Sequence, residues 1–360
     1  MLRRFNHALM NTDDTIGIAL AAFGMSGRVF HAPLLKANPH FRIQRVMERS
    51  KDEARRFLPG TPVSRSFDEL LCNENVRVVV VNTPDSSHYS LAKKSLEAGK
   101  HVVVEKPFTQ TAAEAEELIA LSRRVNRVLT VFQNRRWDGD FLTVQKILRE
   151  GVLGRLVDFE AHWDRYRNYI QEGTWKERAD SGTGLLQNLG PHLIDQALVL
   201  FGMPEAVTAH LRTVRTGGSV CDWFEIRLHY PGTGVLLSSS YLAREPRPRF
   251  ALQGTLGSFV KHGIDPQEQA LAAGGDPRSP GWGAEPESAW GVLTTEGTPE
   301  RKKIETLPGT YSAFYDNLYE CIAHADGLAV KPEEASNVIK IIEAATTSDA
   351  ERRTIRLSQS

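Results

Sequence analysis

The sequence predicts an α/β Rossmann domain with a doubly wound parallel sheet, followed by an α+β domain with an open-faced, mostly antiparallel β-sheet. Short apolar segments alternate with helical segments up to about residue 133, which is typical of crossover units and a parallel sheet. Beyond residue 134, longer segments with antiparallel character take over. We therefore expect a flexible tail over 1–14, a nucleotide-binding domain over 15–133, and a substrate-binding and oligomerisation domain over 134–360.

The first half begins with a short apolar segment, Ile16 to Phe23, followed by Gly24 and Gly27, which indicates a strand, a turn and a helix. The segment 76–81 is dominated by valine, as expected for a strand that is buried on both faces. The predicted strands are 16–23, 41–47, 76–81, 101–104 and 128–132, and the predicted helices are 29–37, 52–57, 87–97 and 111–126.

The second half is predicted to begin with a helix over 140–150. Its predicted strands are 155–164, 206–213, 224–230, 234–241 and 249–253, with a hairpin at Pro231-Gly232-Thr233-Gly234. Residues 263–309 are rich in Gly, Pro and Glu and are expected to form a long loop that Trp282 and Trp290 keep ordered. Helices over 311–325 and 332–345 close the chain.

The composition is that of an ordinary soluble globular protein, with 41% hydrophobic residues. The 44 basic and 44 acidic side chains cancel, which argues against general electrostatic binding to nucleic acid or to an anionic membrane. No apolar run approaches the roughly 20 residues of a membrane helix, and residues 1–14 lack the apolar core of a secretory signal. The three cysteines are too far apart to suggest a disulfide framework or a metal site. We expect a cytoplasmic protein.

The turn after the first strand has the glycine spacing of a nucleotide-binding fingerprint. Gly24 and Gly27 occupy the second and third glycine positions, and Ala22 occupies the first. Glycine at the second position lets backbone N–H groups approach a pyrophosphate at a helix N-terminus. Alanine is tolerated at the first position only if its φ stays negative. The predicted cofactor contacts of this turn are Phe23, Gly24, Met25, Ser26 and Gly27.

Glu48 follows the second strand, about 20 residues after Gly27, where an acid that accepts from the ribose 2′-OH is expected. A carboxylate there favours NAD, because it repels the 2′-phosphate of NADP. Arg49, Ser50 and Lys51 follow at once and would hold that phosphate instead. NAD is therefore preferred only modestly, and both cofactors stay open.

Two further strands carry polar residues to the carboxyl edge of the sheet, where a doubly wound fold binds its ligand. Asn82-Thr83-Pro84 follows one strand and Glu105-Lys106-Pro107 follows the next, so we expect Asn82, Thr83, Pro84, Glu105 and Lys106 to line the cofactor trough. His88, on the next helix, either contacts the cofactor or packs. Beside a nicotinamide ring, Lys106 could hold a reacting alcohol and stabilise its alkoxide, and a cis Lys106–Pro107 bond would aim the amine.

Gly190-Pro191-His192 is interpreted as the start of a helix, with Gly190 as N-cap and Pro191 at the first helical position. The helix dipole disfavours imidazolium there, so His192 is expected to be neutral near pH 7 and able to accept an alcohol proton. Asp195 lies three residues further along the same helical face and could orient His192. The alternative is that His192 only packs.

Four stretches now come together: the glycine turn with Arg28-Val29-Phe30-His31-Ala32-Pro33, Thr83-Pro84 with His88, Glu105-Lys106-Pro107, and Gly190-Pro191-His192-Leu193-Ile194-Asp195. Their order and spacing resemble the glucose–fructose oxidoreductase/inositol dehydrogenase (Gfo/Idh/MocA) family of NAD(P)-dependent oxidoreductases. The resemblance extends from about Thr15 over nearly the whole chain. Gln133-Asn134-Arg135-Arg136-Trp137-Asp138 is similar to the scyllo-inositol-dehydrogenase-like branch.

The resemblance implies an active site between the two domains and a homodimer or tetramer formed through the second-domain sheet. It implies oxidation of a secondary alcohol on a sugar or cyclitol, with hydride passing to a nicotinamide and with Lys106 and His192 as catalytic residues. The family carries a catalytic aspartate four residues before that histidine, where this chain has Asn188. An amide can position a hydroxyl group but does not accept its proton.

Arg165, Tyr166 and Arg167 follow a second-domain strand and lie near Trp163 and Trp175 in the sequence. Polar side chains beside an aromatic wall suit a polyol, so the candidate substrate contacts are Lys106, Arg165, Tyr166, Arg167, Asn188, His192 and Asp195. No metal site is predicted. Two alternatives stay open: a family enzyme with other net chemistry, such as redox-assisted glycoside cleavage, and a nucleotide- and sugar-binding sensor. Asn188 favours the sensor, whereas Lys106 and His192 favour the enzyme.

Overall fold

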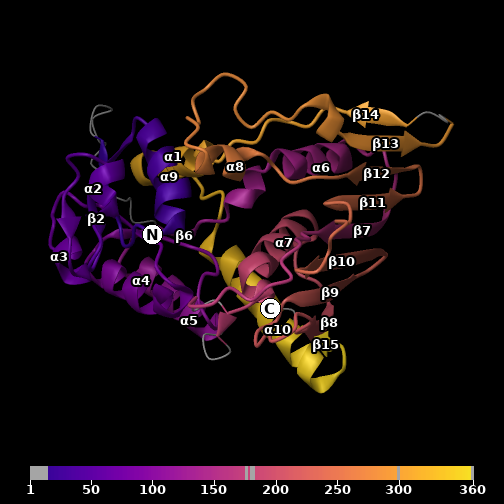
Figure 1. The fold of residues 1–360 in the computed structure, drawn as a ribbon, viewed down its shortest axis with the longest axis horizontal. Helices are drawn as coiled ribbons and strands as arrows, with labels where there is room; N and C mark the ends of the chain where they lie inside the picture. Colours follow the sequence, from indigo (N-terminus) through magenta and orange to yellow (C-terminus); the bar gives the residue numbers. More distant parts are fainter. Residues whose placement is uncertain (1–14, 175–176, 179–182, 298–300, 358–360) are drawn as a thin grey trace, which may run out of the picture.

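The computed structural model describes residues 15–174, 177–178, 183–297 and 301–357, so the predicted tail over 1–14 and Trp175 lie outside the described residues. Two sheets stand at opposite sides of the molecule, with helices α7 (Leu185–Phe201) and α10 (Pro332–Glu351) between them (Figure 1). The predicted pair of an α/β unit and an α+β unit is confirmed.

The first sheet has six parallel strands in the order β3-β2-β1-β4-β5-β6. The order reverses between β1 and β4, which is where a doubly wound sheet opens its ligand crevice. Every residue of β1 and β4 is buried, because helices cover both faces of the sheet. The strands are β1 Ile16–Leu20, β2 Phe41–Met47, β3 Val63–Ser64, β4 Val78–Val81, β5 His101–Val104 and β6 Leu129–Val131.

The helices of this half begin with η1 (Gly27–His31), one π-helical turn that continues into α1 (Ala32–Ala37). The longest helix, α5, starts with a capping box in which Thr111 and Glu114 satisfy each other's backbone N–H groups. The others are α2 Glu53–Phe57, α3 Phe67–Leu71, η2 Asp85–Ser87, α4 His88–Glu97 and α5 Ala112–Arg124. Strand β3 and helix α3 were not predicted.

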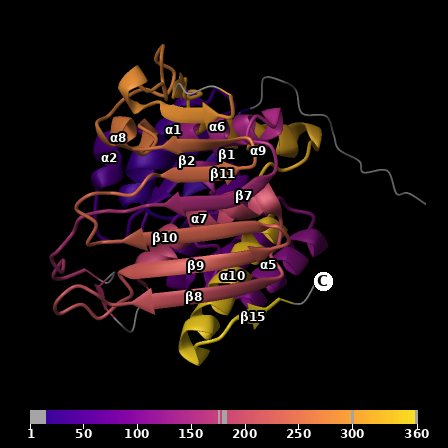
Figure 2. The ribbon, with the colours of Figure 1, turned by 90° about the vertical axis from the view of Figure 1, so that its right-hand side faces the viewer.

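The second sheet has nine strands in the order β14-β13-β12-β11-β7-β10-β9-β8-β15. Strands β7 and β10 pair in parallel, and the other pairs are antiparallel. Its outer face lies toward the viewer in Figure 2, while the helices lie behind it, which confirms an open-faced sheet. Its first members are β7 Leu156–His162, β8 Ala206–Arg212, β9 Trp223–Tyr230, β10 Thr233–Ser240 and β11 Phe250–Gly254, with α6 Gly139–Glu150 preceding them and β15 Ile355–Arg356 at the edge. Assembly of copies through this sheet stays a prediction.

The segment 263–309 is more regular than the predicted long loop. After β12 (Gly257–Lys261) it contains α8 (Gln267–Ala272), η6 (Glu287–Ala289), β13 (Gly291–Thr295) and β14 (Lys302–Ile304). The expected anchoring by tryptophan is confirmed, since Trp282 Nε1 donates to Gln267 Oε1 at 3.2 Å and Trp290 Nε1 donates to the Glu285 carbonyl at 3.3 Å. The strands were missed because they are short and lie in a segment whose Gly, Pro and Glu content indicated a loop.

Helix α7 begins at Leu185, so the prediction that Gly190 and Pro191 start it is wrong. Gly184 is the N-cap, with a φ of +146° that favours glycine. Pro191 lies inside the helix, where its missing N–H removes the intrahelical partner of the Gln187 carbonyl. His192 therefore lies away from the helix N-terminus.

The C-terminal part of the chain returns to the Rossmann half. In α9 (Ser312–His324), Tyr315 Oη is 2.7 Å from His31 Nδ1, and Asp316 Oδ1 accepts from Asn38 Nδ2 at 2.8 Å. The turn η3 (Asn134–Trp137) carries Arg136, which reaches α7 and α10. These contacts connect the Rossmann half to the second half of the chain next to the ligand crevice.

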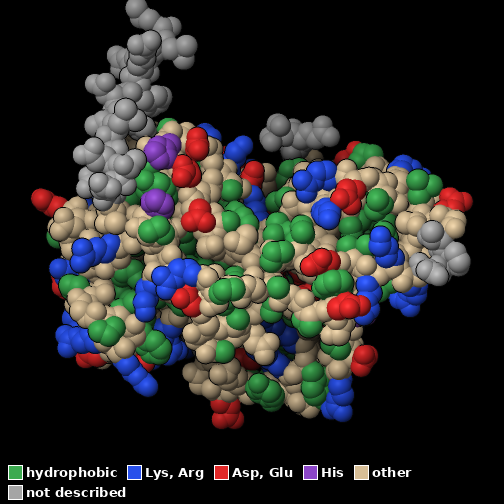
Figure 3. Space-filling view, turned by 90° about the horizontal axis from the view of Figure 1, so that it is seen from above, with side chains coloured by type: hydrophobic (Ala, Val, Ile, Leu, Met, Phe, Trp, Pro, Cys, Tyr) green, Lys and Arg blue, Asp and Glu red, His purple; other side chains and the backbone are tan. Residues whose placement is uncertain are grey.

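Basic and acidic side chains are both spread over the face seen in Figure 3, in keeping with the balanced charge. Among the helices of the described residues, none is long and apolar enough to cross a membrane.

Asp195 has a structural partner in place of the predicted one. Its two carboxylate oxygens accept from Arg136 Nε at 2.8 Å and from Arg136 Nη2 at 2.7 Å; Asp195 is buried and the Arg136 side chain is only 10% exposed. Arg136 Nη1 also donates to Glu334 Oε2 at 2.7 Å. The prediction that Asp195 orients His192 is therefore wrong, because the carboxylate is occupied by the contact that joins η3 to α7.

Replacing Asp195 by Asn should lower the free energy of unfolding by about 3 kcal/mol, because the Arg136 charge would stay buried with half of its partners lost. Urea unfolding followed by circular dichroism measures this. Glu334→Gln is the matched control, since Glu334 contacts the same arginine from a partly exposed position and should cost about 1 kcal/mol or less. Equal effects of the two substitutions would contradict the assignment.

Candidate functional site

A cavity of about 590 Å³ lies between the carboxyl edge of the Rossmann sheet and the second domain. The predicted site residues that line it are Gly24, Met25, Ser26, Asn82, Thr83, Pro84, His88, Glu105, Lys106, Arg165, Arg167, Asn188 and His192. The structure thus brings together candidates from both halves of the chain. The predicted residues that are not among those lining it are Phe23, Gly27, Glu48, Arg49, Ser50, Tyr166 and Asp195.

The glycine turn is tied to the end of β4 by two hydrogen bonds. Asn82 Oδ1 accepts from the Ala22 N–H, and Asn82 Nδ2 donates to the Ala22 carbonyl, both at 2.9 Å. Ala22 is not among the described non-glycine residues with positive φ, so it meets the condition set for alanine at this position. A Cβ on Gly27 would lie 2.8 Å from the Ala22 oxygen, so the helix packs on the turn too closely for any larger residue.

These features fit a dinucleotide. A Cβ on Gly24 would meet nothing within 4 Å, because this backbone faces the cavity. The N–H groups in the first turn of a helix have no intrahelical acceptors and favour an anion. Gly24, Met25 and Ser26 could therefore hold a pyrophosphate, with Asn82, Thr83 and Pro84 along the trough.

Glu48 does not face the cavity. Its side chain is buried, and Oε2 accepts from the Ala54 N–H at 2.9 Å in the first turn of α2. Arg65 holds the same loop by donating to the Glu48 carbonyl at 3.0 Å. Arg49 and Ser50 are exposed just beyond. The carboxylate therefore stabilises the loop after β2, and the argument for NAD that rested on it loses its basis.

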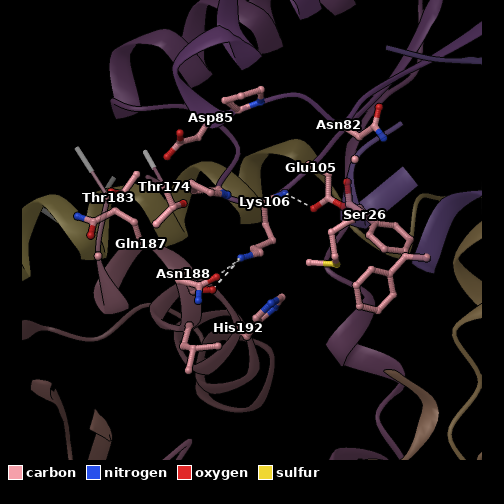
Figure 4. A pocket seen from close by; sticks show the side chains of 18 of the residues that line it. Ser26, Asn82, Asp85, Glu105, Lys106, Thr174, Thr183, Gln187, Asn188 and His192 are labelled. Carbon is pink, nitrogen blue, oxygen red and sulfur yellow. Dashed lines mark hydrogen bonds between the residues drawn. The ribbon is translucent and has the colours of Figure 1, made fainter. Parts of the chain in front are cut away.

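Lys106 connects the two domains. Its Nζ donates to the backbone carbonyl of Asn188 at 2.7 Å and lies 3.5 Å from the Asn188 Oδ1 (Figure 4). Pro191 follows three residues after Asn188, in the stretch of α7 where the helical hydrogen bonding is interrupted. The Lys106–Pro107 bond is cis, the isomer that was considered from the sequence.

Glu105 lies under Lys106 in a buried network. Glu105 Oε1 is 3.0 Å from His31 Nε2, and Oε2 accepts from the Lys106 N–H at 3.1 Å. Burial opposes ionisation of Glu105, but the hydrogen bond from His31 and the nearby positive charges outweigh it and lower the pKa of Glu105. A charged Glu105 is therefore available to fix the strand end that carries Lys106.

His88 lines the cavity, but its ring nitrogens face the backbone. Nδ1 is 2.8 Å from the Pro107 carbonyl and Nε2 is 3.0 Å from the Thr83 carbonyl. These contacts connect the segments that follow β4 and β5. Packing was one of its two predicted roles.

His192 lies beside Lys106 in the cavity, with its ring 5.7 Å from that of Trp163 (Figure 4). Its Nδ1 is buried and has no hydrogen-bond partner among the described residues. Burial and the positive charges of Lys106, Arg135, Arg249 and Arg165 hold the pKa of His192 well below its usual range. The imidazole is neutral as predicted, but burial and neighbouring cations are the cause and not a helix N-terminus.

Arg165 and Arg167 line the cavity, whereas Tyr166 does not. Successive side chains of an extended segment point to opposite sides, so Tyr166 turns outward, where its hydroxyl accepts from Arg244 Nη2 at 2.6 Å. The prediction that Tyr166 contacts the substrate is therefore wrong for this cavity.

The lining residues that the sequence interpretation missed include Arg135, Tyr241 and Gln187. Arg135 stacks over Trp163 at 4.7 Å and bonds to Glu268 and Tyr311. Tyr241 Oη lies 3.5 Å from Asn188 Nδ2. Tyr241 is the last residue of the predicted strand 234–241 and directly follows the observed β10, and this place at a strand end could have pointed to it. Nothing in the sequence places Gln187. Among the described residues, no cluster of three or more metal-binding side chains is found.

Two family models match the chain. One, described as "Oxidoreductase family, NAD-binding Rossmann fold", covers residues 16–133, and the other, "Oxidoreductase family, C-terminal alpha/beta domain", covers residues 145–357. The chain is similar to scyllo-inositol 2-dehydrogenase (NADP(+)) IolW of Bacillus subtilis, with 40% identity over 347 residues and 96% of each chain covered. It is also 41% identical to oxidoreductase C115.03 of Schizosaccharomyces pombe, covering 95% of this chain and 99% of the relative.

Solved structures share the fold over nearly the full length. Oxidoreductase yvaA from Bacillus subtilis has a TM-score of 0.93 and 38% identity, with 97% of this chain and 100% of that chain covered. An oxidoreductase from Bacteroides fragilis has a TM-score of 0.88 and 48% identity, with 96% of this chain and 100% of that chain covered.

The neutral state of His192 can be measured directly by NMR. Its imidazole signals, assigned by their absence in His192→Gln, should remain those of the neutral ring at pH 7 and titrate only as the pH falls well below the usual histidine pKa of about 6.5. Lys106→Met removes one of the charges that lower the pKa of His192 and should raise it, whereas Lys146→Met on the surface of α6 should not. An ordinary pKa for His192 in the unsubstituted protein would contradict this account.

Proposed function

The chain belongs to the Gfo/Idh/MocA family of NAD(P)-dependent oxidoreductases, and we propose that it transfers a hydride between a nicotinamide cofactor and the secondary alcohol or ketone of a sugar or cyclitol. The observation that carries this proposal is the meeting of Lys106, from the end of β5, with Asn188 and His192, from α7, in one cavity. The nicotinamide supplies the hydride acceptor or donor when bound.

In the direction of oxidation, Lys106 and His192 share the handling of the alcohol. Lys106 Nζ donates a hydrogen bond to the alcohol oxygen and stabilises the negative charge that grows there. His192 is neutral, so a ring nitrogen can accept the hydroxyl proton. In the direction of reduction, the same nitrogen returns the proton to the carbonyl oxygen.

In this proposal Asn188 positions the Lys106 ammonium and a substrate hydroxyl, and its side chain carries no charge. Its backbone carbonyl orients the Lys106 ammonium, and its side-chain amide is placed to hold a substrate hydroxyl near Tyr241. Since an amide does not take a proton, the proton transfer falls to His192.

We propose that NADP(H) is used in preference to NAD(H). Glu48 is buried and bonded to the Ala54 N–H of α2, so it is not placed to accept from a ribose hydroxyl, and the preference for NAD that rested on it loses its support. Arg49, Ser50 and Lys51 are exposed at the end of β2, where that phosphate would lie. The relative IolW is named for NADP(+), which supports the same choice.

The two alternatives have less support. A sensor that only binds its ligands would not require Lys106 and His192 to lie in the same cavity. Among the described residues that line the cavity, none favours glycoside cleavage over simple oxidation or reduction. Asn188 is the feature in favour of a sensor. Tight cofactor binding with no turnover on inositols, aldoses or their keto forms, together with turnover gained in Asn188→Asp, would establish that the chain had lost a base.

Replacing Lys106 by Met should lower kcat for the preferred polyol about 10²–10⁴-fold while NADPH affinity changes little, because positioned proton and charge handling is lost and the cofactor cradle is kept. Nicotinamide absorbance measures turnover, and NADPH fluorescence measures binding. Lys146→Met is the surface control. Undiminished turnover in Lys106→Met would contradict the proposed mechanism.

Replacing Arg49 by Ala should weaken NADPH binding roughly 10-fold or more and leave NADH binding unchanged, because a charge-assisted hydrogen bond to the 2′-phosphate is worth about 1.5–3 kcal/mol. Arg42→Ala is the control, since Arg42 is exposed near the opposite end of the same strand. Fluorescence titration of both cofactors provides the comparison. Equal losses for NADPH and NADH would show that Arg49 does not select the phosphate.

A further inference from the structure

We propose that the substrate carries an acidic group, a carboxylate or a phosphate, which binds between Arg165 and Arg167 on the second-domain side of the cavity. This proposal rests on the proposed function for the reaction and adds the chemical class of the substrate. Both arginines come from the segment that follows β7, and both line the cavity.

The carboxylates on that side of the cavity already have partners. Glu177 accepts from Arg215 Nη1 at 3.1 Å and Nη2 at 2.8 Å, and Glu268 is bonded to Arg135. The charge of Glu268 still acts on Arg165, but burial and the neighbouring cations outweigh it, so the pKa of Arg165 remains lowered.

Arg165 and Arg167 have aromatic rings as neighbours instead of acids. The Arg165 guanidinium carbon lies 6.0 Å from the centre of the Trp163 ring, and that of Arg167 lies 5.4 Å from the centre of the Tyr241 ring. Among the residues that the structure describes, neither guanidinium has a carboxylate within salt-bridge distance. A guanidinium beside a ring keeps its in-plane N–H donors available for a ligand.

The positive charge of Arg165 is costly as it stands. Burial lowers the pKa of Arg165, and the charge of Arg167 lowers it further, so the Arg165 guanidinium is destabilised by lost solvation and by its neighbour, whereas Arg167 lies at the exposed rim of the cavity. An anion between them would relieve both effects. Paired guanidinium groups also match the oxygens of a carboxylate or phosphate, to which they donate two parallel hydrogen bonds.

A neutral polyol accounts for this arrangement less well. Hydroxyl groups accept hydrogen bonds from arginine but bring no charge, and the single negative charge that develops during oxidation is already met by Lys106. Arg165 and His192 line the same cavity, so an acid bound at Arg165 would share that cavity with the reacting end of the substrate. The phosphates of the cofactor are expected at the glycine turn on the opposite side.

The test compares matched probes on the protein saturated with NADP⁺. D-glucuronate is paired with D-glucose, D-gluconate with D-glucitol, and myo-inositol 1-phosphate with myo-inositol, and isothermal titration calorimetry gives each Kd. At least one acidic probe should bind about 10-fold or more tightly than its neutral partner. Whether the carboxylates or the phosphate gain more identifies the acid. Equal or tighter binding of all neutral partners, or no measurable binding of any acidic probe, overturns the proposal.

Substitutions then test the residues. The double variant Arg165→Gln/Arg167→Gln should lose the preference for the acidic probe and keep its NADPH affinity. Arg244→Gln is the matched control, because Arg244 is exposed at the same end of the sheet, bonds to Tyr166 and does not line the cavity. An acid preference that survives in the double variant, or that disappears equally in Arg244→Gln, also overturns the proposal.

Failure of this inference is distinguishable from failure of the proposed function. If a neutral probe is turned over efficiently with NADP, at a higher kcat/KM than its acidic partner, the proposal of an acidic substrate is wrong and the proposed oxidoreductase function stands. Tight binding of an acidic probe that depends on Arg165 and Arg167, without turnover of any probe, supports the acid site while the hydride-transfer proposal falls.

Discussion

The contact between the Lys106 ammonium and the Asn188 carbonyl is the one on which the arrangement of this molecule depends. It joins the end of a Rossmann strand to a helix of the second domain across 2.7 Å. The carbonyl belongs to a helix that contains Pro191, and the ammonium is carried by a strand end that Glu105 fixes from below. Lys106 and Asn188 both line the cavity, which lies where the end of β5 meets the first turns of α7.

Several contacts outside the cavity hold β5 and α7 in the relative positions that the Lys106–Asn188 contact needs. Helix α9 returns to the Rossmann half, and its Tyr315 bonds to the same His31 that holds Glu105. Arg136 joins η3, α7 and α10 through buried or partly buried ion pairs. Two sheets that share few direct contacts are thus positioned by the helices between them (Figure 1).

Elements with strong two-sided burial were predictable from the sequence, and those set by distant partners were not. Strands β2 and β5 have the predicted bounds. β5 is a run of buried valines, which specifies a strand by itself, and β2 was recognised from its alternation of apolar and polar residues. The start of α7 was missed because Pro191 suggests a first turn, while the fully buried surroundings of the helix allow it in the interior. Strands β13 and β14 were missed because their pairing partners, and not their composition, make them strands.

The candidate site shows the same limit. Motif spacing was enough to place Gly24, Lys106 and His192 at one cavity. The directions of Glu48, Tyr166 and Asp195 depend on Ala54, Arg244 and Arg136, which are not apparent from their neighbours in sequence. A local sequence pattern can indicate which residues belong to a candidate site. The tertiary structure decides which partner each of these side chains binds, and so which way it points.

The lining of the cavity is divided between two separately built surfaces, and this has a consequence for the choice of substrate. The nucleotide cradle and Lys106 come from the parallel sheet, while the groups beside the substrate come from α7 and the segment after β7. With the site proposed above, a change of substrate would require new side chains on the second surface alone. The nucleotide-binding turn and Lys106 would stay as they are.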